Sequence, residues 1–318
     1  MCRRRCFYCR GIVHRCLRLA GRCTNTGSPR GFVQIHVINI TVYSGSVKGY
    51  TSIMNIVRAV MIGDVVGEPG LKALEKKLPT IINDNAINFI VVNGENSADG
   101  FGITESVLKR ILDCGVDVVT SGNHVWEKRE FWQTLNSDAK VLRPANYSSD
   151  APGRGWLCME KAGIRWMVIN MQGRELMNAI DCPFRCFDRI QESIPPDTNP
   201  IILVDFHAES SREKEALGHY LDGRAALVAG THTHVQTADE RLLPKGTAYI
   251  TDLGMTGISN SVIGMDPAIC LDRMRKQVLY RMEIATDNEA GDKSSVAVQG
   301  IIAEFDADSG KAVSVKRI

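Results

Sequence analysis

The chain has 318 residues, of which 44% are hydrophobic and 23% are charged, and its formal net charge is +2. This composition is typical of an ordinary soluble enzyme, with enough chain for one large or two medium domains. The longest apolar stretch near the start, residues 32–43, is interrupted and too short to cross a bilayer, which takes about 20 residues. The first 16 residues also lack the continuous apolar core of a secretory signal.

Charge divides the chain into two parts near Met54. Residues 1–53 contain no Asp or Glu, nine Arg or Lys residues and five of the ten cysteines. The remaining 29 of the 38 basic residues stand against all 36 acidic residues in 54–318, a formal charge of −7. We therefore predict one domain over 54–318, with Met54 as the native start. The basic, Cys-rich extension over 1–53 is predicted to be disordered or not part of the native protein.

Two other interpretations of the extension stay open. Its arginine-rich, acid-free composition is typical of a transit peptide, although its cysteines are not. Cys6 and Cys9 form a C-x-x-C pair, with Cys16 and Cys23 following, which is compatible with a zinc knuckle. The five cysteines of the body are odd in number and scattered, so we expect reduced thiols and a cytoplasmic protein.

Short apolar runs alternate with helical patterns from residue 55 onward. Runs of this length that end in glycine or polar residues are typical of buried strands. Their alternation with helices predicts an α/β fold with a largely buried sheet. The five predicted strands are "NIVRAVMIGD" (55–64), "INFIVVNGEN" (87–96), "VDVVTSGNH" (116–124), "NPIILVDFH" (199–207) and "AALVAGTHTH" (225–234).

Helix and turn signals fit the same pattern. Leu71, Leu74 and Leu78 share one face of a predicted helix between the first two strands. Thr104 is a suitable N-cap for the next helix. The tail over 298–318 alternates apolar and polar residues about an Asp-Ser-Gly turn. It predicts a C-terminal β-hairpin without a chemical role.

Side chains that bind metals follow each predicted strand, and in open α/β sheets the loops after the carboxyl ends of strands build the active site. On an extended segment, His232 and His234 share one face and lie about 6.5 to 7 Å apart. Each such residue alone also fits a capping, turn or core role. Their joint position at one edge of one sheet predicts a metal site instead. The residues concerned are Asp64, Glu95, Asn96, Asn123, His124, His207, His232 and His234.

The ligand types restrict the choice of metal. Carboxylates, amide oxygens and imidazoles without cysteine suit Mn, Fe or Zn, and hold too much nitrogen for Ca or Mg alone. Because the candidates exceed what one ion needs, we expect two ions about 3.5 to 4 Å apart that share a carboxylate. Two divalent ions bring +4, whereas Asp64, Glu95 and a bridging hydroxide bring −3, so the site should attract an anion. Such a pair suits the hydrolysis of phosphate esters.

Five motifs follow the predicted strands: "GDVVG", "NGEN", "GNHVW", "DFHAE" and "GTHTHVQTADERLLPKGTAYITDLGMTG". They are similar to the YmdB-type family of calcineurin-like metallophosphoesterases, known as 2′,3′-cyclic-nucleotide 2′-phosphodiesterases. The resemblance runs from about Met54 to the C-terminus. It implies a four-layer α/β/β/α sandwich, a dinuclear iron or manganese site and homo-oligomers, whereas the residues alone imply an α/β sheet with one metal-bearing edge.

The resemblance also implies roles for the candidate residues. The wider superfamily begins with Asp-x-His, but here Val65 follows Asp64, and Asn96 takes the place of the missing histidine. By this analogy His124 donates a proton to the leaving oxygen or stabilises charge on the phosphorus centre. Structural packing against Trp126 is its alternative role. One metal would be held by Asp64, Glu95, Asn96 and His234, and the other by Glu95, Asn123, His207 and His232, with Glu95 as the bridge.

The substrate is less constrained by the residues. Arg143, Asn146 and Arg174 are candidate contacts to substrate phosphate, although an arginine at either place is also compatible with a surface role. The expected substrate is a small-molecule phosphodiester, namely a 2′,3′-cyclic nucleotide and also a 3′,5′-cyclic nucleotide. Neither a membrane nor, for 54–318, a nucleic acid is an expected partner.

Three alternative functions compete with this one. A phosphomonoesterase such as a nucleotidase would use the same metals. A signalling protein could bind a nucleotide without turning it over, but a degenerate site usually lacks one or two ligands. A dinucleotide-dependent oxidoreductase is disfavoured, because "GDVVGEPG" lacks G-x-G-x-x-G and Asp64 would face the pyrophosphate.

Overall fold

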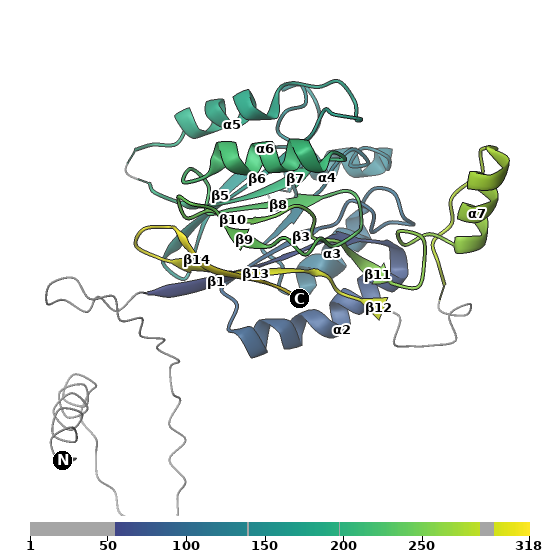
Figure 1. The fold of residues 1–318 in the computed structure, drawn as a ribbon, viewed down its shortest axis with the longest axis horizontal. Coiled ribbons are helices and arrows are strands. Elements are labelled where there is room, and N and C mark those ends of the chain that lie inside the picture. Colours follow the sequence, from purple (N-terminus) through teal and green to yellow (C-terminus); the bar gives the residue numbers. More distant parts are fainter. Residues whose placement is uncertain (1–54, 139, 197, 287–295) are drawn as a thin grey trace, which may run out of the picture. The chain divides into compact units, whose positions relative to one another are not determined.

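A computed structural model describes residues 55–138, 140–196, 198–286 and 296–318 (Figure 1). These residues belong to a compact unit that spans 52–318. The predictions for 1–53 therefore lie outside the described residues. Within the described ranges, none of the helices combines the length and the apolar character that a bilayer crossing requires.

The described strands form two large sheets and one small one. The first large sheet has the order β14-β13-β1-β3-β4, and the second has the order β5-β6-β7-β8-β10-β9. The first contains β1 (Ile56–Ile62), β3 (Phe89–Asn93), β4 (Val118–Thr120), β13 (Gly300–Asp306) and β14 (Ala312–Arg317). The second contains β5 (Trp156–Lys161), β6 (Ile164–Gln172), β7 (Ile201–His207), β8 (Leu227–Thr231), β9 (Arg241–Leu242) and β10 (Ala248–Ile250). The small sheet joins β2 (Asp64–Val65), β11 (Met255–Ile258) and β12 (Val296–Ala297).

The strands that carry the predicted ligands do not share one sheet. Strands β1, β3 and β4 lie in the first sheet, whereas β7 and β8 lie in the second. The expectation of a single metal-bearing sheet was therefore wrong. The physical reason is that strands buried on both faces have the same apolar run in either sheet, so the run itself carries no information about the partner strand.

Helices cover the outer face of each large sheet (Figure 1). Leu71, Leu74 and Leu78 of α2 pack with β1, β3 and β4, while Phe187 of α5 and Leu217 of α6 pack with the second sheet. The result is the α/β/β/α sandwich that the family resemblance implied. The helices are α2 (Gly67–Asn85), α3 (Glu105–Asp113), η1 (Arg129–Phe131), α4 (Trp132–Ser137), α5 (Pro183–Glu192), α6 (Ser211–Leu221) and α7 (Pro267–Lys276).

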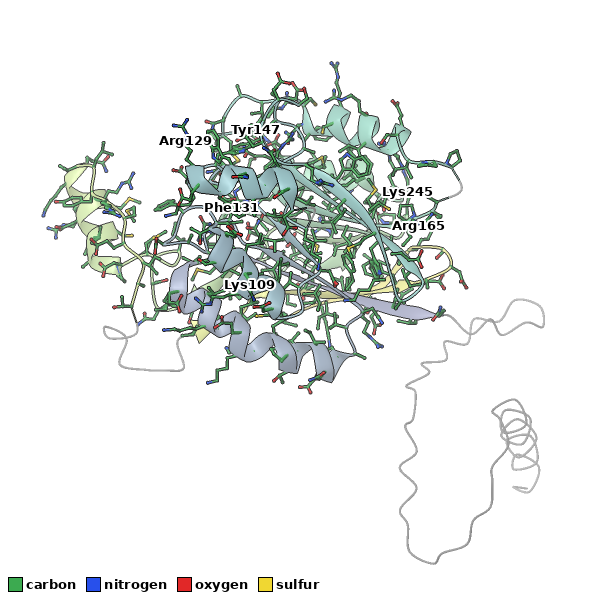
Figure 2. The ribbon with its side chains drawn as sticks, turned by 180° about the vertical axis from the view of Figure 1, so that it is seen from behind. Lys109, Arg129, Phe131, Tyr147, Arg165 and Lys245 are labelled. Carbon is green, nitrogen blue, oxygen red and sulfur yellow. The ribbon has the colours of Figure 1, made fainter. Side chains whose placement is uncertain are left out.

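Local signals in the sequence agree with the structure. The Thr104 side chain accepts a hydrogen bond from the backbone N–H of Val107, so it caps α3 as predicted. Lys109 of the same helix points outward (Figure 2), and its ammonium group pairs with Asp113 one turn later. Strands β13 and β14 pair antiparallel, which confirms the C-terminal hairpin. Strand β13 also pairs with β1, so the hairpin completes the first sheet.

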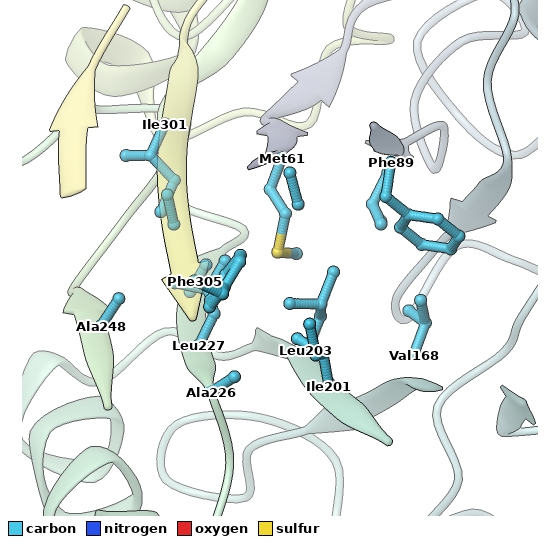
Figure 3. Close-up of a cluster of buried hydrophobic side chains, with 14 of the residues drawn as sticks. Met61, Phe89, Val168, Ile201, Leu203, Ala226, Leu227, Ala248, Ile301 and Phe305 are labelled. Atoms are coloured by element: carbon cyan, nitrogen blue, oxygen red, sulfur yellow. The ribbon is translucent and has the colours of Figure 1, made fainter. Parts of the chain in front are cut away.

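The largest apolar layer lies between the two sheets (Figure 3). Met61 and Phe305 of the first sheet face Leu203 of the second across this layer. Trp166 of β6 is fully buried there and stacks on Phe89, with ring centroids 4.7 Å apart. Because this layer joins the two sheets, it also sets the distance between their carboxyl ends.

Replacement of Trp166 by Ala should lower the free energy of unfolding by roughly 3–5 kcal/mol, because it leaves a cavity between the sheets. Trp166→Phe keeps the stacking and removes an indole N–H that is buried without an acceptor among the described residues, so it should cost less than about 1.5 kcal/mol. Urea denaturation measures both values. Equal losses in the two variants would contradict the role given to the ring.

Candidate functional site

The carboxyl ends of strands from both large sheets converge on one buried cluster. Asp64, Glu95 and His207 are fully buried, and each offers one ligand atom such that all three atoms lie within 4.8 Å of one another. Asp64 Oδ1 and Glu95 Oε2 are buried with no hydrogen-bond donor among the described residues. Burial of a carboxylate oxygen without a donor is unfavourable, so these atoms indicate a missing positive charge.

The tautomer of His207 follows from its neighbours. The Thr231 hydroxyl donates to Asp205 Oδ1 at 2.7 Å, so its oxygen accepts from His207 Nδ1, which lies 3.0 Å away. This hydrogen bond assigns the ring proton to Nδ1 and leaves a lone pair on Nε2. That Nε2 lies 3.0 Å from Glu95 Oε2 and 3.1 Å from Asn123 Oδ1, two atoms that only accept.

His232 presents a second lone pair to the same point. Its Nε2 lies 3.1 Å from Glu209 Oε2, so the ring proton belongs on Nε2 as a donor to that carboxylate. The lone pair is then on Nδ1, which lies 3.0 Å from His207 Nε2. Four electron-rich atoms, from Glu95, Asn123, His207 and His232, therefore face one another. Such an arrangement is repulsive without a cation, and its nitrogen and oxygen atoms fit a divalent metal.

His234 faces the opposite side of the cluster. Its Nδ1 donates to the carbonyl oxygen of Ile263 at 2.8 Å, which leaves the lone pair on Nε2. This Nε2 lies 3.0 Å from the Asn96 amide nitrogen and 3.8 Å from Asp64 Oδ1. A turn of the Asn96 amide would bring its oxygen to the same place. Asp64, Glu95, Asn96 and His234 thus form a second group of atoms that could hold a metal.

Gly122 allows the cluster to close. A Cβ atom at this position would lie 1.9 Å from Glu95 Oε2 and 2.2 Å from the His207 ring. Only a glycine lets the loop after β4 approach the two ligands this closely. The residue lies in "SGNH" beside Asn123, but its spatial role has no signal in a single sequence.

His124 lies at the rim of the cluster with its side chain 28% exposed. Its backbone N–H donates to Glu95 Oε1, and its ring Nδ1 lies 3.2 Å from Glu127 Oε1. Its ring meets Phe101 edge-on, with centroids 5.0 Å apart. The predicted alternative partner, Trp126, packs instead edge-on against Tyr147.

The three predicted phosphate contacts lie in different surroundings. Both polar groups of the buried Asn146 amide bind backbone, since Nδ2 donates to Gln172 and Asp181 and Oδ1 accepts from Gln172. Arg143 is buried and donates to backbone carbonyl groups. Arg174 is exposed, and its backbone N–H donates to Glu213. The partners in these hydrogen bonds are not metal-ligand candidates. The role of Arg143, Asn146 and Arg174 in substrate binding stays a prediction.

Comparison with known proteins identifies the family. A family model described as YmdB-like protein matches residues 60–318. The chain belongs to the YmdB-like family. A Bacillus subtilis relative named 2′,3′-cyclic-nucleotide 2′-phosphodiesterase is 40% identical over 261 residues, which are 82% of this chain and 96% of that protein. A Mycoplasma pneumoniae relative named putative phosphatase/phosphodiesterase is 31% identical over 83% of this chain and 93% of its own length.

Solved structures agree with this assignment to the YmdB-like proteins. A hypothetical protein from Thermus thermophilus superimposes with a TM-score of 0.74 at 37% identity, over 82% of this chain and 98% of that one. A Mycoplasma pneumoniae protein titled a novel phosphatase gives a TM-score of 0.76 at 28% identity, over 83% and 93%. A Thermus thermophilus 5′-nucleotidase precursor, at 12% identity and a TM-score of 0.51, shares the fold alone over 82% of this chain and 54% of its own.

Sequence reasoning missed the residues of this YmdB-like chain that position the ligands. Asp205 is buried in β7 and accepts hydrogen bonds from Thr120, Thr231 and Asn93. Through Thr231 it orients His207, as carboxylates and hydroxyls behind a ligand imidazole commonly do. An acidic residue inside an apolar strand, two positions before a histidine, is the signal that could have found it.

The loop that carries His232 and His234 is strained and held by a buried ion pair. Both histidines have positive φ angles, 100° and 63°, which non-glycine residues rarely adopt. Asp252 Oδ2 accepts from the backbone N–H and the hydroxyl of Thr233, between the two histidines. Lys214 on α6 donates to the same oxygen at 2.7 Å, and both charged side chains are almost fully buried.

Burial sets the protonation of the ligands before any metal binds. It lowers the pKa of His207 to about 4 and that of His232 to about 3, so both imidazoles are neutral at pH 7 and ready to bind metal. Burial raises the pKa of Asp64, although the nearby imidazoles oppose this, and raises that of Glu95 to about 7. A proton on Glu95 therefore competes with metal near neutral pH.

Metal affinity should fall by up to about tenfold for each pH unit below 7, because Glu95 must release its proton to bind. The imidazoles do not add to this fall above pH 5, since their pKa values are lower. Titration of metal-free protein with Mn²⁺ between pH 5.5 and 8 measures the slope. Elemental analysis of the Glu95→Gln variant should show that it has lost most of its metal at every pH. A flat slope in the wild type would contradict the assignment of Glu95.

Lys214→Met should destabilise the protein by about 3–5 kcal/mol, because it leaves Asp252 buried without its positive partner. It should also reduce metal content, since Asp252 holds the loop between His232 and His234. Lys214→Met with Asp252→Asn removes both charges and should recover part of the stability. Urea denaturation and elemental analysis give the two readouts. A double variant no more stable than Lys214→Met would argue against the ion pair as the cause.

Proposed function

We propose that this chain is a metal-dependent phosphodiesterase that hydrolyses cyclic nucleotides with 2′,3′-cyclic and also 3′,5′-cyclic phosphate. The observation that carries the proposal is the group of lone pairs from two sheets that face one another, with no donor between them among the described residues. The name of the Bacillus subtilis relative supports the diester as the substrate class. The phosphatase among the structural relatives supports hydrolysis of a phosphate ester.

Two groups of ligands would hold two divalent ions. Asp64, Asn96 and His234 would bind one ion, Asn123, His207 and His232 would bind the other, and Glu95 would bridge them. The mixture of imidazole, carboxylate and amide oxygen favours iron or manganese, with zinc as a third choice. When bound, the two ions would supply a nucleophile at neutral pH and stabilise charge on the phosphate. A homo-oligomer and a cytoplasmic location stay predictions of the sequence.

His124 would act on the leaving group. Its side chain is partly exposed at the rim, and its backbone N–H donates to the Glu95 carboxylate. A ring proton on Nδ1 would donate to Glu127 Oε1, which lies 3.2 Å away and orients the imidazole. As a general acid, the ring would donate a proton from Nε2 to the ribose oxygen that leaves phosphorus. The edge contact with Phe101 holds the ring in this position.

Turnover of 2′,3′-cyclic AMP and bis-p-nitrophenyl phosphate, with Mn²⁺ or Fe²⁺ supplied, tests the function directly. His124→Ala should lower kcat by about 10²–10⁴-fold and leave metal content unchanged, because the residue contributes a proton and no ligand. His219→Ala, an exposed histidine on α6, is the matched control and should keep full activity. Activity confined to phosphomonoesters would defeat the diester function. A metal-loaded wild type without turnover would favour nucleotide binding alone.

A further inference from the structure

A cavity of about 620 Å³ lies beside the second sheet, between the segment that joins α4 to β5, the start of β5 and helix α5. None of the metal-ligand candidates lines it. Tyr147, labelled in Figure 2, lines the cavity and donates from its hydroxyl to Gln172 at the end of β6. Since Gln172 pairs with His207 across β6 and β7, the cavity adjoins the metal-ligand cluster without including it.

The lining of this cavity is positively charged. Arg143, Arg154 and Arg189 stand against Asp181 alone, which leaves a formal charge of +2. Asp181 pairs with Arg189 at 3.4 Å. Across the described ranges of the chain, no carboxylate forms an ion pair with Arg143 or Arg154. Two guanidinium groups at one cavity therefore lack an anionic partner within those ranges.

Arg143 carries the strongest signal, because it is 6% exposed. Its two terminal nitrogens donate to the carbonyl oxygens of Pro144 and Ser148, and its Nε is buried without an acceptor among the described residues. Burial lowers the pKa of this guanidinium, and no carboxylate of the described chain offsets that effect. A buried cation that keeps a free donor and has no counter-charge is unfavourable unless an anion binds to it.

Aromatic rings complete the lining. Trp156, at the start of β5, lines the cavity, and 38% of its surface is exposed. Tyr147 lines the cavity from the segment that joins α4 to β5. Tyr147 is held edge-on against Trp126, with ring centroids 4.6 Å apart. An exposed indole beside arginines is suited to stacking on a nucleobase while the guanidinium groups bind its phosphate.

We propose that this arginine cavity binds the phosphomonoester dianion of a nucleotide, at a site separate from the metal-ligand cluster. A formal charge of +2 matches a phosphomonoester, which carries about −1.5 to −2 at pH 7, better than a diester with a single charge. Hydrolysis of a 2′,3′-cyclic nucleotide at its 2′ bond leaves such a monoester, so this link to a product rests on the proposed function. Binding here does not require the metals and can be tested apart from the phosphodiesterase activity.

The test is calorimetric titration of the full chain after metal removal, with 3′-AMP, 2′,3′-cyclic AMP and adenosine as ligands. Without metals the ligand cluster has no cation that could hold a phosphate, so bound 3′-AMP reports on the arginine cavity. Wild-type protein should bind 3′-AMP about tenfold or more tightly than cyclic AMP or adenosine. Equal affinities for the three ligands, or no binding of 3′-AMP at millimolar concentration, would overturn the proposal.

Variants assign the binding to the cavity. Arg154→Gln removes an exposed guanidinium from the lining and should weaken 3′-AMP binding about tenfold. Arg165→Gln is the matched control and should leave 3′-AMP binding unchanged. Arg165 is an exposed residue of β6 that does not line the cavity, and Figure 2 labels it at a different place from Tyr147. Arg143→Lys keeps the charge and loses the planar fork, so it should also weaken binding. If Arg154→Gln and Arg165→Gln bind 3′-AMP equally well, the cavity is not the site.

The dianion could belong to a separate nucleotide or to a second phosphate on the substrate. With metal-loaded enzyme, a 5′-phosphorylated 2′,3′-cyclic nucleotide should show a KM about tenfold lower than its unphosphorylated form if the phosphate is the substrate's own. Arg154→Gln should abolish that difference. Equal KM values together with a change in kcat on addition of 3′-AMP assign the cavity to a separate nucleotide. Absence of all turnover, with 3′-AMP binding intact, removes the phosphodiesterase function and leaves the cavity assigned.

Discussion

The site depends on the unfavourable contact of buried lone pairs. Glu95 Oε2 and His232 Nδ1 each lie 3.0 Å from His207 Nε2, and no donor of the described chain relieves the repulsion of these acceptor atoms. A fold keeps such atoms together only if contacts with the surrounding structure fix the side chain that carries each of them. The two sheets and the apolar layer between them provide that support, because each sheet delivers some of the ligands and neither alone delivers the group.

Each of the three histidines among the metal-ligand candidates is held by a residue that is not itself a candidate. Thr231 and Asp205 hold His207, Glu209 holds His232, and the carbonyl of Ile263 holds His234. The same contacts determine which ring nitrogen keeps its proton. Positioning and protonation are therefore set by one network of hydrogen bonds. In the arginine cavity the charges are the opposite of those in the metal-ligand cluster, because a buried donor there lacks an acceptor among the described residues. The cluster therefore requires a cation, whereas the cavity requires an anion.

The sequence predicted those features that depend on neighbours along the chain. Asp64 and His207 end apolar runs, and Thr104 precedes a helical pattern, so strand ends and caps were readable from order alone. It could not assign the strands to two sheets, since the choice of partner depends on contacts far apart in sequence. Gly122 and the Lys214–Asp252 pair were missed for the same reason. Their importance lies in atoms that only the fold brings together.

Strand β13 lies next to β1 in the first sheet, and Gly300 at its start pairs with Ile62 just before Asp64. During synthesis, β1 leaves the ribosome long before its antiparallel neighbour exists. One side of the strand that leads to Asp64 therefore stays unpaired until almost the whole domain has been made. This pairing partner is made only after every metal-ligand candidate, from Asp64 to His234, is already present in the chain.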